Sequence, residues 1–214
     1  MKPTPTLQYT SFETPVGRLS VAYRDATACY SDLDVDDSVF EAGCRSRLGV
    51  LPLRNAEAPP ARLESAVRDF FQGSGRYQGP VDLALLSDLQ QRALRKVMEL
   101  PRGEVRTYSW IAREIGAPKA ARAVGTAMAR NPVPVLVPCH RAIRNDFIPR
   151  TYGCGGPAKK AAILTWEGVD LTSLQRATRR RQRASQAGTE PLQEPGSRPH
   201  SRPDRSSPAE TARD

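Results

Sequence analysis

The fold and the chemistry of this chain centre on residues 131–143, which read NPVPVLVPCHRAI. Three prolines in this stretch fix the backbone φ angle and keep the segment out of a helix. The apolar residues 133–137 predict a short buried strand. The end of that strand would present Cys139 on a rigid base, directly before His140.

Cys139 beside His140 is a candidate nucleophile. A cysteine attacks as the thiolate, and a neighbouring histidine or helix N-terminus can lower the thiol pKa from about 8.5 by several units. The chain has two histidines, and the other, His200, lies in a segment with the composition of a disordered tail. A buried structural thiol is the alternative interpretation, because cysteine is among the most buried residue types.

The sequences PCHR at residues 138–141 and NPVP at residues 131–134 resemble the active-site signature of the O6-alkylguanine-DNA alkyltransferases, the methylated-DNA–protein-cysteine methyltransferases. The resemblance runs from about residue 89 to residue 169, and more faintly from the N-terminus. It implies an α+β fold with a small, ribonuclease H-like domain of sheet and helix over residues 1–85. A mostly helical, winged-helix-like domain, carrying the DNA-binding surface and the active site, would follow over residues 86–171.

In that family an alkyl group passes irreversibly from O6 of guanine to the active cysteine, so each protein molecule acts once and no cofactor is used. The resemblance implies the same reaction here, on O6-alkylguanine and also on O4-alkylthymine in double-stranded DNA. A base inside stacked DNA cannot be reached in line. The nucleotide therefore has to be flipped out of the duplex, here from the minor groove, at a cost of roughly a few kcal/mol.

The resemblance also assigns catalytic roles. Cys139 matches the family's nucleophile, and His140 would take the thiol proton through a water molecule. Glu167 matches the glutamate that holds this histidine, and Asn131 matches the asparagine that orders the turn. Tyr108 matches the tyrosine that donates a proton to the leaving base, help that is typically worth ~10²–10⁴-fold. Without the family, Glu167 would be an ordinary helix-end carboxylate and Tyr108 a core aromatic residue.

Two short helices are predicted next to these residues, one between a Thr107 N-cap and Gly116, the other over residues 119–130. Two short helices joined by a glycine-containing turn are typical of a helix-turn-helix. Small side chains let the second helix approach another surface closely, either DNA or, as the alternative, a protein core. The resemblance identifies it as a minor-groove recognition helix, in which Arg122 fills the gap left by the flipped nucleotide. The DNA-contacting residues implied are Lys119, Ala120, Ala121, Arg122, Ala123, Gly125 and Arg130.

The predicted alkyl pocket is lined by Tyr108, Val137 and Tyr152. The loop over residues 146–152 departs from the family, which usually has glycines where this chain has Phe147 and, before Tyr152, proline, arginine and threonine. Losing glycines removes easy access to positive φ angles. We therefore expect the shape of this loop, and the range of alkyl groups accepted, to differ from those of relatives.

The charge of the chain is distributed unevenly. Residues 1–80 carry nine Lys and Arg against ten Asp and Glu, a net of −1, whereas residues 81–171 carry fourteen against eight, a net of +6. Residues 172–214 carry nine against five, a net of +4, with no aromatic residue, and this composition predicts a disordered, solvated basic tail. The alternative is that arginines of this tail extend a final helix or touch phosphates non-specifically. This asymmetry suits a polyanionic partner such as DNA, although a merely solvated basic surface is the alternative.

Other classes of protein are disfavoured by composition. The four cysteines form no CxxC pair, and with two histidines they make no plausible zinc site, so we predict no metal and free thiols. No apolar run of ~18 residues predicts a membrane span, and the first residues lack the apolar core of a secretory signal. We expect an intracellular monomer, cytoplasmic if bacterial and nuclear if eukaryotic.

The remaining elements are predicted from periodicity. Strands are expected within residues 7–33, where Leu19, Val21 and Tyr23 alternate with polar or small residues as in a half-buried strand, and over residues 81–85. Helices are predicted over residues 37–48, 60–72, 89–100 and 157–166.

An alternative hypothesis is that the chain binds DNA without transfer chemistry, either as a sensor of alkyl lesions or as a helix-turn-helix regulator. The altered loop and the basic surplus motivate this hypothesis. Family members of that kind replace the cysteine, usually by tryptophan, so the presence of Cys139 favours transfer. A Cys-His hydrolase is a more distant hypothesis, since turnover needs room for product to depart.

Overall fold

The computed structural model describes residues 6–50, 52–54, 58–73, 75–150 and 152–186. By its internal contacts the chain divides into one unit, Met1–Arg179, and a second, Arg180–Asp214. The sheet, helices α1 to α6 within residues 37–166, and every predicted site residue belong to the first unit. The predicted domain boundary near residue 85 falls inside this unit and stays a prediction.

The N-terminal part of the chain forms a four-stranded sheet, of which three strands lie within residues 7–33, where strands were predicted, and the fourth was not predicted. Three strands, β1 (Gln8–Thr14), β2 (Gly17–Arg24) and β3 (Thr27–Leu33), pair antiparallel in sequence order. A short strand, β4 (Leu53–Arg54), pairs parallel with the outer side of β1, so the strand order is β3-β2-β1-β4.

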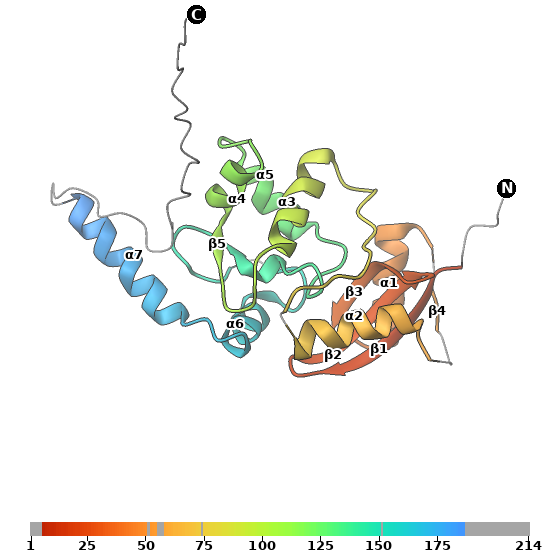
Figure 1. The fold of residues 1–214 in the computed structure, drawn as a ribbon. Coiled ribbons are helices and arrows are strands. Elements are labelled where there is room, and N and C mark those ends of the chain that lie inside the picture. Colours follow the sequence, from red (N-terminus) through yellow and green to blue (C-terminus); the bar gives the residue numbers. More distant parts are fainter. Residues whose placement is uncertain (1–5, 51, 55–57, 74, 151, 187–214) are drawn as a thin grey trace, which may run out of the picture. The chain divides into compact units, whose positions relative to one another are not determined.

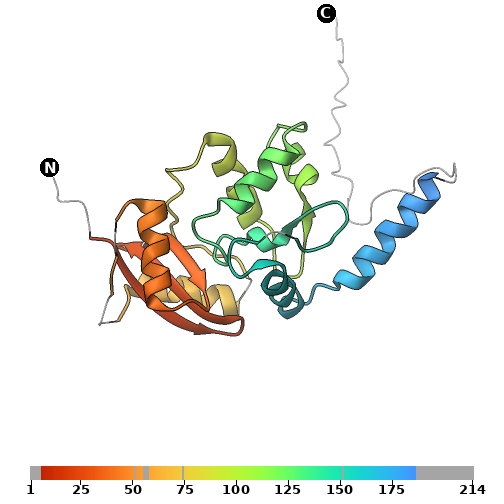
Figure 2. The same ribbon diagram turned by 180° about the vertical axis from the view of Figure 1, so that it is seen from behind.

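A helix covers each face of this sheet. Helix α2 (Ala61–Gln72) lies over the face seen in Figure 1, and α1 (Asp37–Leu48) lies over the opposite face, in front in Figure 2. The prediction of a half-buried β2 is therefore wrong. Ser20 and Ala22, on the face that was expected to meet solvent, are 1% and 0% exposed, because α1 packs there.

Residues 81–85 were predicted as a strand and form none. Val81 makes a single bridge to Ala28, whose N–H donates to the Pro80 carbonyl at 3.0 Å and whose carbonyl accepts from Asp82 at 2.8 Å. The chain then turns away, so the ladder stops after one residue. This contact fixes where the sheet ends and the helical part begins.

Three helices follow: α3 (Asp88–Met98), α4 (Tyr108–Glu114) and α5 (Ala121–Ala129). The predicted N-cap of α4 is confirmed, because the Thr107 hydroxyl accepts a hydrogen bond from the Trp110 N–H at 3.1 Å. Gly116 stands past the helix end with φ of 72°. Helix α5 begins two residues later than predicted.

Two short strands connect these helices to the cysteine. Strand β5 (Arg106–Thr107) directly precedes α4, and β6 (Ala142–Ile143) directly follows the Cys-His-Arg sequence. They pair in parallel, which brings the first turn of α4 next to the turn that carries Cys139. Helix α6 (Gly156–Trp166) packs against the turn that carries Cys139, and its first turn contains a proline, as predicted.

The prediction of disorder from residue 172 is wrong as far as residue 186, because α7 (Leu171–Gln186) occupies this stretch. Leu171 and Leu174 pack against a small apolar cluster, and Asp170 caps the helix by accepting from the Ser173 N–H at 3.0 Å. Two leucines and a cap are a weak signal in an arginine-rich stretch. The rest of the predicted tail lies outside the described residues, as does His200.

Within the part of the chain that the structure describes, none of the helices combines the length and apolar character that crossing a membrane requires. One apolar core joins the sheet, α2, α3, α4 and α5 to the residues before Cys139. The cysteine is therefore held by the same core that holds the N-terminal sheet.

Candidate active site

The stretch before Cys139 is a buried turn. Every residue from 131 to 143 is buried, but the predicted strand over residues 133–137 is wrong. The Val137 N–H donates to the Val133 carbonyl at 2.9 Å, and Val135 has φ of 73°, which is rare for a β-branched residue. Prolines lack the N–H that a strand ladder needs, so this apolar run closes into a turn instead.

Asn131 holds this turn from inside. Its amide nitrogen donates to the Val137 carbonyl at 2.9 Å, and its amide oxygen accepts from the Val133 N–H at 3.1 Å. Asn131 is 4% exposed, so both bonds are shielded from water. The structure thus gives this residue the ordering contacts that the sequence resemblance implied.

Ser31 of β3 holds the same turn from outside. Its N–H donates to the Pro132 carbonyl at 3.0 Å and its hydroxyl donates to the Pro134 carbonyl at 2.7 Å. Ser31 is separated from Pro134 by 103 residues, and no local sequence pattern points to this contact. The N-terminal sheet therefore fixes the turn that precedes Cys139.

Cys139 begins a single 3-10 turn, Cys139–Arg141, and is 3% exposed. Burial raises the pKa of its thiol above the ordinary value, although the Asn131 side chain and the charge of Lys160 act in the opposite direction. The expected lowering of the thiol pKa by the neighbouring histidine is not what the structure shows. The resting side chain is a thiol, and its proton has to be removed when it attacks.

His140, Glu167 and Arg141 form a buried network. His140 Nε2 lies 3.0 Å from Glu167 Oε1, and Arg141 Nη2 donates to the same oxygen at 2.6 Å. Arg141 Nε adds bonds to both carboxylate oxygens, at 3.1 and 3.0 Å, and Nη1 donates to the Leu100 carbonyl at 2.6 Å. The side chains of all three are fully buried. Sequence analysis missed Arg141, whose motif position was the signal.

The charges in this network define the state of the histidine. Burial opposes ionisation of Glu167, but hydrogen bonds from His140 and Arg141 outweigh it and hold the pKa of Glu167 at about 2. Burial lowers the pKa of His140, so its imidazole is neutral. A carboxylate only accepts hydrogen bonds, so Nε2 carries the imidazole proton and Nδ1 keeps a lone pair. Among the described residues Nδ1 is buried and has no hydrogen-bond partner.

Lys160 of α6 is a second buried cation near the cysteine that sequence analysis missed. Its ammonium donates at 2.6 Å to the carbonyl of Ala142, the residue that directly follows the 3-10 turn. Burial lowers its pKa to about 8, and its charge favours the thiolate form of Cys139. Its position among the apolar residues of α6 was the available signal.

Tyr108, the first residue of α4, lies near Cys139 and against α5. Its pKa is raised, first by burial and then by the proximity of Cys139, so its hydroxyl stays protonated at neutral pH. A Cβ added at Gly125 would lie 3.4 Å from the Tyr108 ring. Gly125 thus faces this ring, and a methyl group there would touch it at about van der Waals distance.

Known proteins with similar sequences identify the family of this chain. The family profile "6-O-methylguanine DNA methyltransferase, DNA binding domain" matches residues 88–169. A methylated-DNA–protein-cysteine methyltransferase of Mycobacterium leprae is 36% identical over 166 residues, which cover 77% of this chain and 94% of the relative. The chain belongs to the methylated-DNA–protein-cysteine methyltransferase family. The sequence resemblance is confirmed.

Solved structures of the family have the same mixed helix-and-sheet fold. The crystal structure of the Mycobacterium tuberculosis O6-methylguanine methyltransferase matches with a TM-score of 0.61 and 29% identity, covering 76% of this chain and 93% of that one. A crystal structure of the M. tuberculosis protein in complex with DNA matches with a TM-score of 0.60 and 26% identity, covering 78% and 98%. The predicted α+β class is confirmed at this level.

The methyltransferase's predicted recognition helix presents one exposed stripe. The predicted contact residues on it are Lys119, Arg122 and Arg130, while Ala120, Ala121, Ala123 and Gly125 are half-buried. Thr126 and Ala129 are also exposed, and sequence analysis missed them although they follow Arg122 at helical spacing. The structure is compatible with a surface contact through this stripe, and the individual DNA contacts stay predictions.

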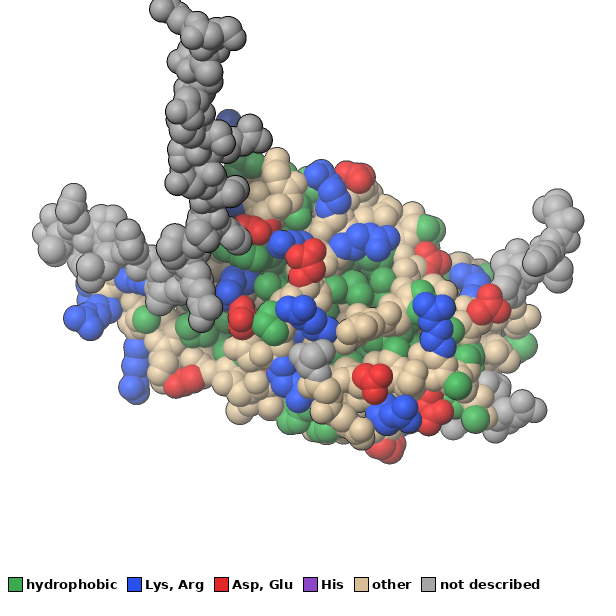
Figure 3. Space-filling model, viewed as in Figure 1, with side chains coloured by type: hydrophobic (Ala, Val, Ile, Leu, Met, Phe, Trp, Pro, Cys, Tyr) green, Lys and Arg blue, Asp and Glu red, His purple; other side chains and the backbone are tan. Residues whose placement is uncertain are grey.

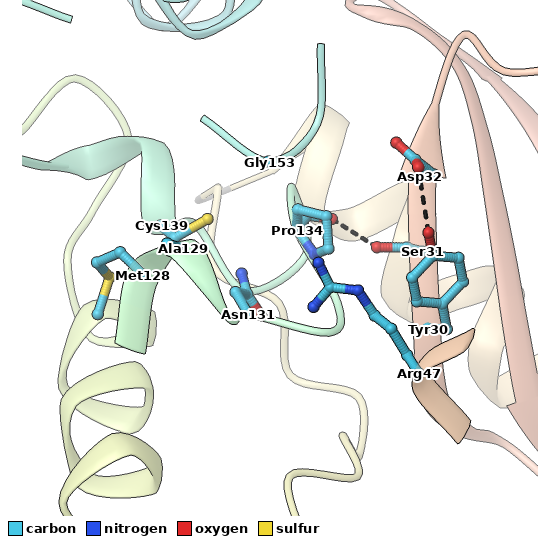
Figure 4. Close-up of a pocket in the computed structure, with 10 residues that line it drawn as sticks. All are labelled: Tyr30, Ser31, Asp32, Arg47, Met128, Ala129, Asn131, Pro134, Cys139 and Gly153. Atoms are coloured by element: carbon cyan, nitrogen blue, oxygen red, sulfur yellow. Dashed lines mark hydrogen bonds between the residues drawn. The ribbon is translucent and has the colours of Figure 1, made fainter. Parts of the chain in front are cut away.

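A small pocket of about 20 Å³ reaches Cys139 (Figure 4). Its lining residues are Tyr30, Ser31, Asp32, Arg47, Met128, Ala129, Asn131, Pro134, Cys139 and Gly153. The predicted pocket residues Tyr108, Val137 and Tyr152 are not among them. Contributions from the N-terminal sheet and α1 were missed, because residues so distant in sequence give no local signal.

Tyr152 nevertheless lies close to the buried network of His140, Arg141 and Glu167. Its ring meets the His140 ring edge-to-face, with centroids 6.4 Å apart, and no described residue forms a hydrogen bond with its buried hydroxyl. Burial raises its pKa well above the ordinary value. Val137 is fully buried and contributes its carbonyl to Asn131. Contact of these residues with an alkyl group stays a prediction.

The loop after the catalytic turn adopts a positive φ without glycine. Phe147 has φ of 54°, and its carbonyl accepts from Gln175 of α7 at 3.0 Å. Its ring packs with Leu171 and Leu174. A helix outside the family profile thus helps to hold the loop that departs from the family.

The described residues contain no group of three or more His, Cys, Asp or Glu side chains placed to hold a metal ion. All four cysteines are free and buried.

Proposed function

We propose that this chain repairs alkylated DNA by transferring the alkyl group from O6 of guanine to Sγ of Cys139, once per protein molecule. One observation carries the proposal: Cys139 directly precedes a buried histidine whose Nε2 is held by Glu167 and whose Nδ1 has no hydrogen-bond partner among the residues that the structure describes. The names of the curated relatives support the same reaction.

In this reaction His140 Nδ1 takes the thiol proton of Cys139 through a water molecule. The sulfur attacks the alkyl carbon, a C–S bond forms, and the C–O6 bond breaks with its electron pair going to guanine. Tyr108 gives its hydroxyl proton to the departing guanine. The tyrosinate that results takes a proton back from the protonated His140. The product is a thioether, which is not hydrolysed, so the protein acts once. Glu167 stabilises the imidazolium that forms in between.

In the proposed complex α5 enters the minor groove of double-stranded DNA, and Arg122 fills the space left by the flipped nucleotide. Figure 3 shows Lys and Arg side chains interspersed with Asp and Glu on the face that it presents. We therefore locate the DNA contact at the exposed stripe of α5, and the overall charge of the surface does not enter the argument. Helices α3 to α5 with strands β5 and β6 would act as a winged-helix unit, and the N-terminal sheet as a ribonuclease H-like domain.

The same proposal covers the finer expectations. O6-alkylguanine is the principal lesion and O4-alkylthymine a second one. The protein acts as a monomer, in the compartment that holds the DNA: the cytoplasm of a bacterium or the nucleus of a eukaryote.

The test is the intact mass of the protein after incubation with excess duplex that contains one O6-methylguanine. We expect a complete shift by one methyl group in place of one hydrogen, and no shift for Cys139→Ser. An unchanged wild-type mass would overturn the proposal.

A second candidate function is lesion sensing without transfer. The raised pKa of the Cys139 thiol and the position of Phe147 in the altered loop favour it. Tight, lesion-dependent binding of the duplex by a wild-type protein whose mass does not change would support this function.

A further inference from the structure

Helix α7, the last helix of the described chain, has two different faces (Figure 1). The residues at positions 171, 174, 175 and 178 are half-buried and share one face of the helix by their spacing. Four arginines repeat this spacing on another face, and all four are exposed: Arg176, Arg179, Arg180 and Arg183. We call these four residues the α7 arginine stripe. The stripe lies outside residues 88–169, which the family profile matches.

The half-buried face attaches α7 to the loop that follows the Cys-His-Arg sequence. Leu171 and Leu174 pack with the ring of Phe147. Gln175 Nε2 donates to the Phe147 carbonyl at 3.0 Å. This docked part of the helix belongs to the same unit of the chain as Cys139. The first arginines of the stripe are therefore carried by a helix that is already folded and held in place.

The stripe has a net positive charge. The sequence has no Asp or Glu between Asp170 and Glu190, so α7 itself contains no acidic residue. Asp170 stands directly before the helix, and its charge interacts with Arg176. Within the described residues, no ion pair engages the other three arginines of the stripe. One carboxylate at the helix start is therefore opposed by four guanidinium groups and cannot neutralise them.

The spacing of these charges indicates what binds there. Like charges three and four residues apart on a helix repel each other, so the stripe destabilises α7 unless an anion lies against it. Guanidinium groups bind phosphate oxygens well, and a nucleic-acid backbone offers them in a row. A lipid surface fits less well. A helix that lies on a membrane needs an exposed apolar face, and the two leucines of α7 are packed against Phe147.

We propose that the α7 arginine stripe binds the phosphate backbone of duplex DNA, as a second contact in addition to α5. Phosphates carry no sequence or lesion information, so the stripe adds affinity for any duplex and leaves recognition of the alkylated base to other residues. Because α7 is folded before DNA arrives, binding orders side chains only, which lowers its entropic cost. The inference goes beyond the proposed function, since it needs DNA as the partner but no transfer chemistry.

The experiment measures dissociation constants by fluorescence anisotropy over a range of salt concentrations. The two ligands are an undamaged duplex and the same duplex with one O6-methylguanine. All proteins carry Cys139→Ser, so that no transfer occurs during the measurement. One variant replaces three arginines of the stripe: R176Q, R179Q and R183Q. A matched control removes the same number of charges from exposed arginines of α1 and α2: R45Q, R62Q and R68Q.

We expect the stripe variant to bind both duplexes about 10- to 100-fold more weakly at low salt. The slope of log K against log salt concentration should become shallower by about 2 to 3, because about three phosphate contacts are lost. The ratio of the two dissociation constants should stay within about threefold of the parent's, as expected for contacts to phosphates. The control variant should change either affinity by less than about threefold.

A third variant separates charge from helix stability. Lysine at the same three positions of the stripe keeps the charge, and lysine, glutamine and arginine have similar helix propensities. We expect the lysine variant to bind both duplexes within about fivefold of the parent protein. A lysine variant as weak as the glutamine variant would contradict a role for charge.

Other outcomes would also overturn the inference. Equally small effects of the two glutamine variants would show that the stripe is a solvated surface. Equally large effects would show that overall charge controls binding and that α7 has no special part. Either result leaves the proposed function standing, because that function is tested by the mass of Cys139 after reaction. If the parent protein binds neither duplex, both the inference and the proposed function lose their partner.

Discussion

Two turns flank the Cys-His-Arg sequence, and the same device builds both. In each, a side-chain oxygen accepts a hydrogen bond from the backbone N–H two residues later. Before the cysteine, Asn131 accepts from Val133 at 3.1 Å, and after it Asp146 accepts from Ile148 at 3.1 Å. The surroundings differ, because Asn131 is 4% exposed whereas the side chain of Asp146 is 28% exposed.

The difference in burial separates two tasks. Around the first turn the backbone groups have no water to replace lost partners, and Ser31 and Asn131 fix it from both sides. Around the second, Asp146 also pairs with Arg150 at the surface, where solvent can substitute. We infer that the first turn sets the position of the sulfur, and that the loop after it can vary in sequence without loss of the chemistry.

The largest effect is expected from breaking the buried network that closes the first turn. Glu167→Ala leaves Arg141 buried without its carboxylate and should cost about 3–5 kcal/mol of unfolding free energy, as well as slowing transfer. Urea unfolding measures the cost. The control is Glu99→Ala, at an exposed glutamate paired with Lys96, for which we expect less than about 1 kcal/mol. A similar cost for both variants would remove the distinction between buried and exposed parts.

The next largest effect is expected from acid, which should destabilise the buried network of His140 and Glu167. The pKa of Glu167 is about 2 against an ordinary 4.5, so its stabilisation is complete above pH 4.5 and is lost as pH falls toward 2. Burial lowers the pKa of His140 below 6.5, so the unfolded chain binds a proton that the folded one does not, and stability also falls below about pH 6.5. Glu167 alone should contribute on the order of 3 kcal/mol.

Urea unfolding at a series of pH values tests this expectation. His140→Gln should flatten the decline between about pH 6.5 and about pH 4.5 and leave the decline at lower pH. Wild-type stability that is constant from about pH 7 to about pH 4 would contradict the assignment of a neutral, buried His140.

Asn131→Ala attacks the first turn directly. It leaves the Val133 N–H without a partner in a buried site and removes one of two hydrogen bonds to the Val137 carbonyl, which still accepts from the Cys139 N–H at 2.7 Å, so we expect a cost of roughly 1–3 kcal/mol. Transfer from O6-methylguanine DNA should slow more than lesion binding weakens, because the turn positions the sulfur. A variant that binds and transfers as the wild type does would show that the turn is held by Ser31 and packing alone.

Asp146→Ala is the matched change in the second turn and should have the smallest effect. The Ile148 N–H can bond to water once the carboxylate is gone, so we expect less than about 1 kcal/mol. Methyl transfer should stay within about twofold of the wild type. If this substitution costs as much as Asn131→Ala, burial does not distinguish the two turns.

Local patterns in the sequence were enough to predict most helices and strands. The alternation in β2, the Thr107 cap and the glycine after α4 each act through neighbouring residues. The burial of both faces of β2 was not predictable in this way, because it depends on which helices pack there. A run of apolar residues reads alike in a strand and in a buried turn, so residues 133–137 were assigned wrongly.

The family motif predicted Cys139, His140 and Glu167 as catalytic residues, and the structure brings the last two into contact. It did not predict the partners that complete the site. Arg141 meets Glu167 across 26 residues, and Ser31 meets Pro134 across 103. Helix α7 was disfavoured against a disordered tail because its stability depends on Leu171 and Leu174 meeting a distant cluster rather than on its own composition.

The central claim is that Cys139 alone, of four buried thiols, takes the alkyl group. The direct measurement is peptide mass spectrometry of the protein after reaction with duplex O6-methylguanine, with each cysteine located on its own peptide. We predict S-methylcysteine at position 139 in stoichiometric amount and none at Cys29, Cys44 or Cys154. Methylation at any of those three, or at none of the four, would contradict the claim.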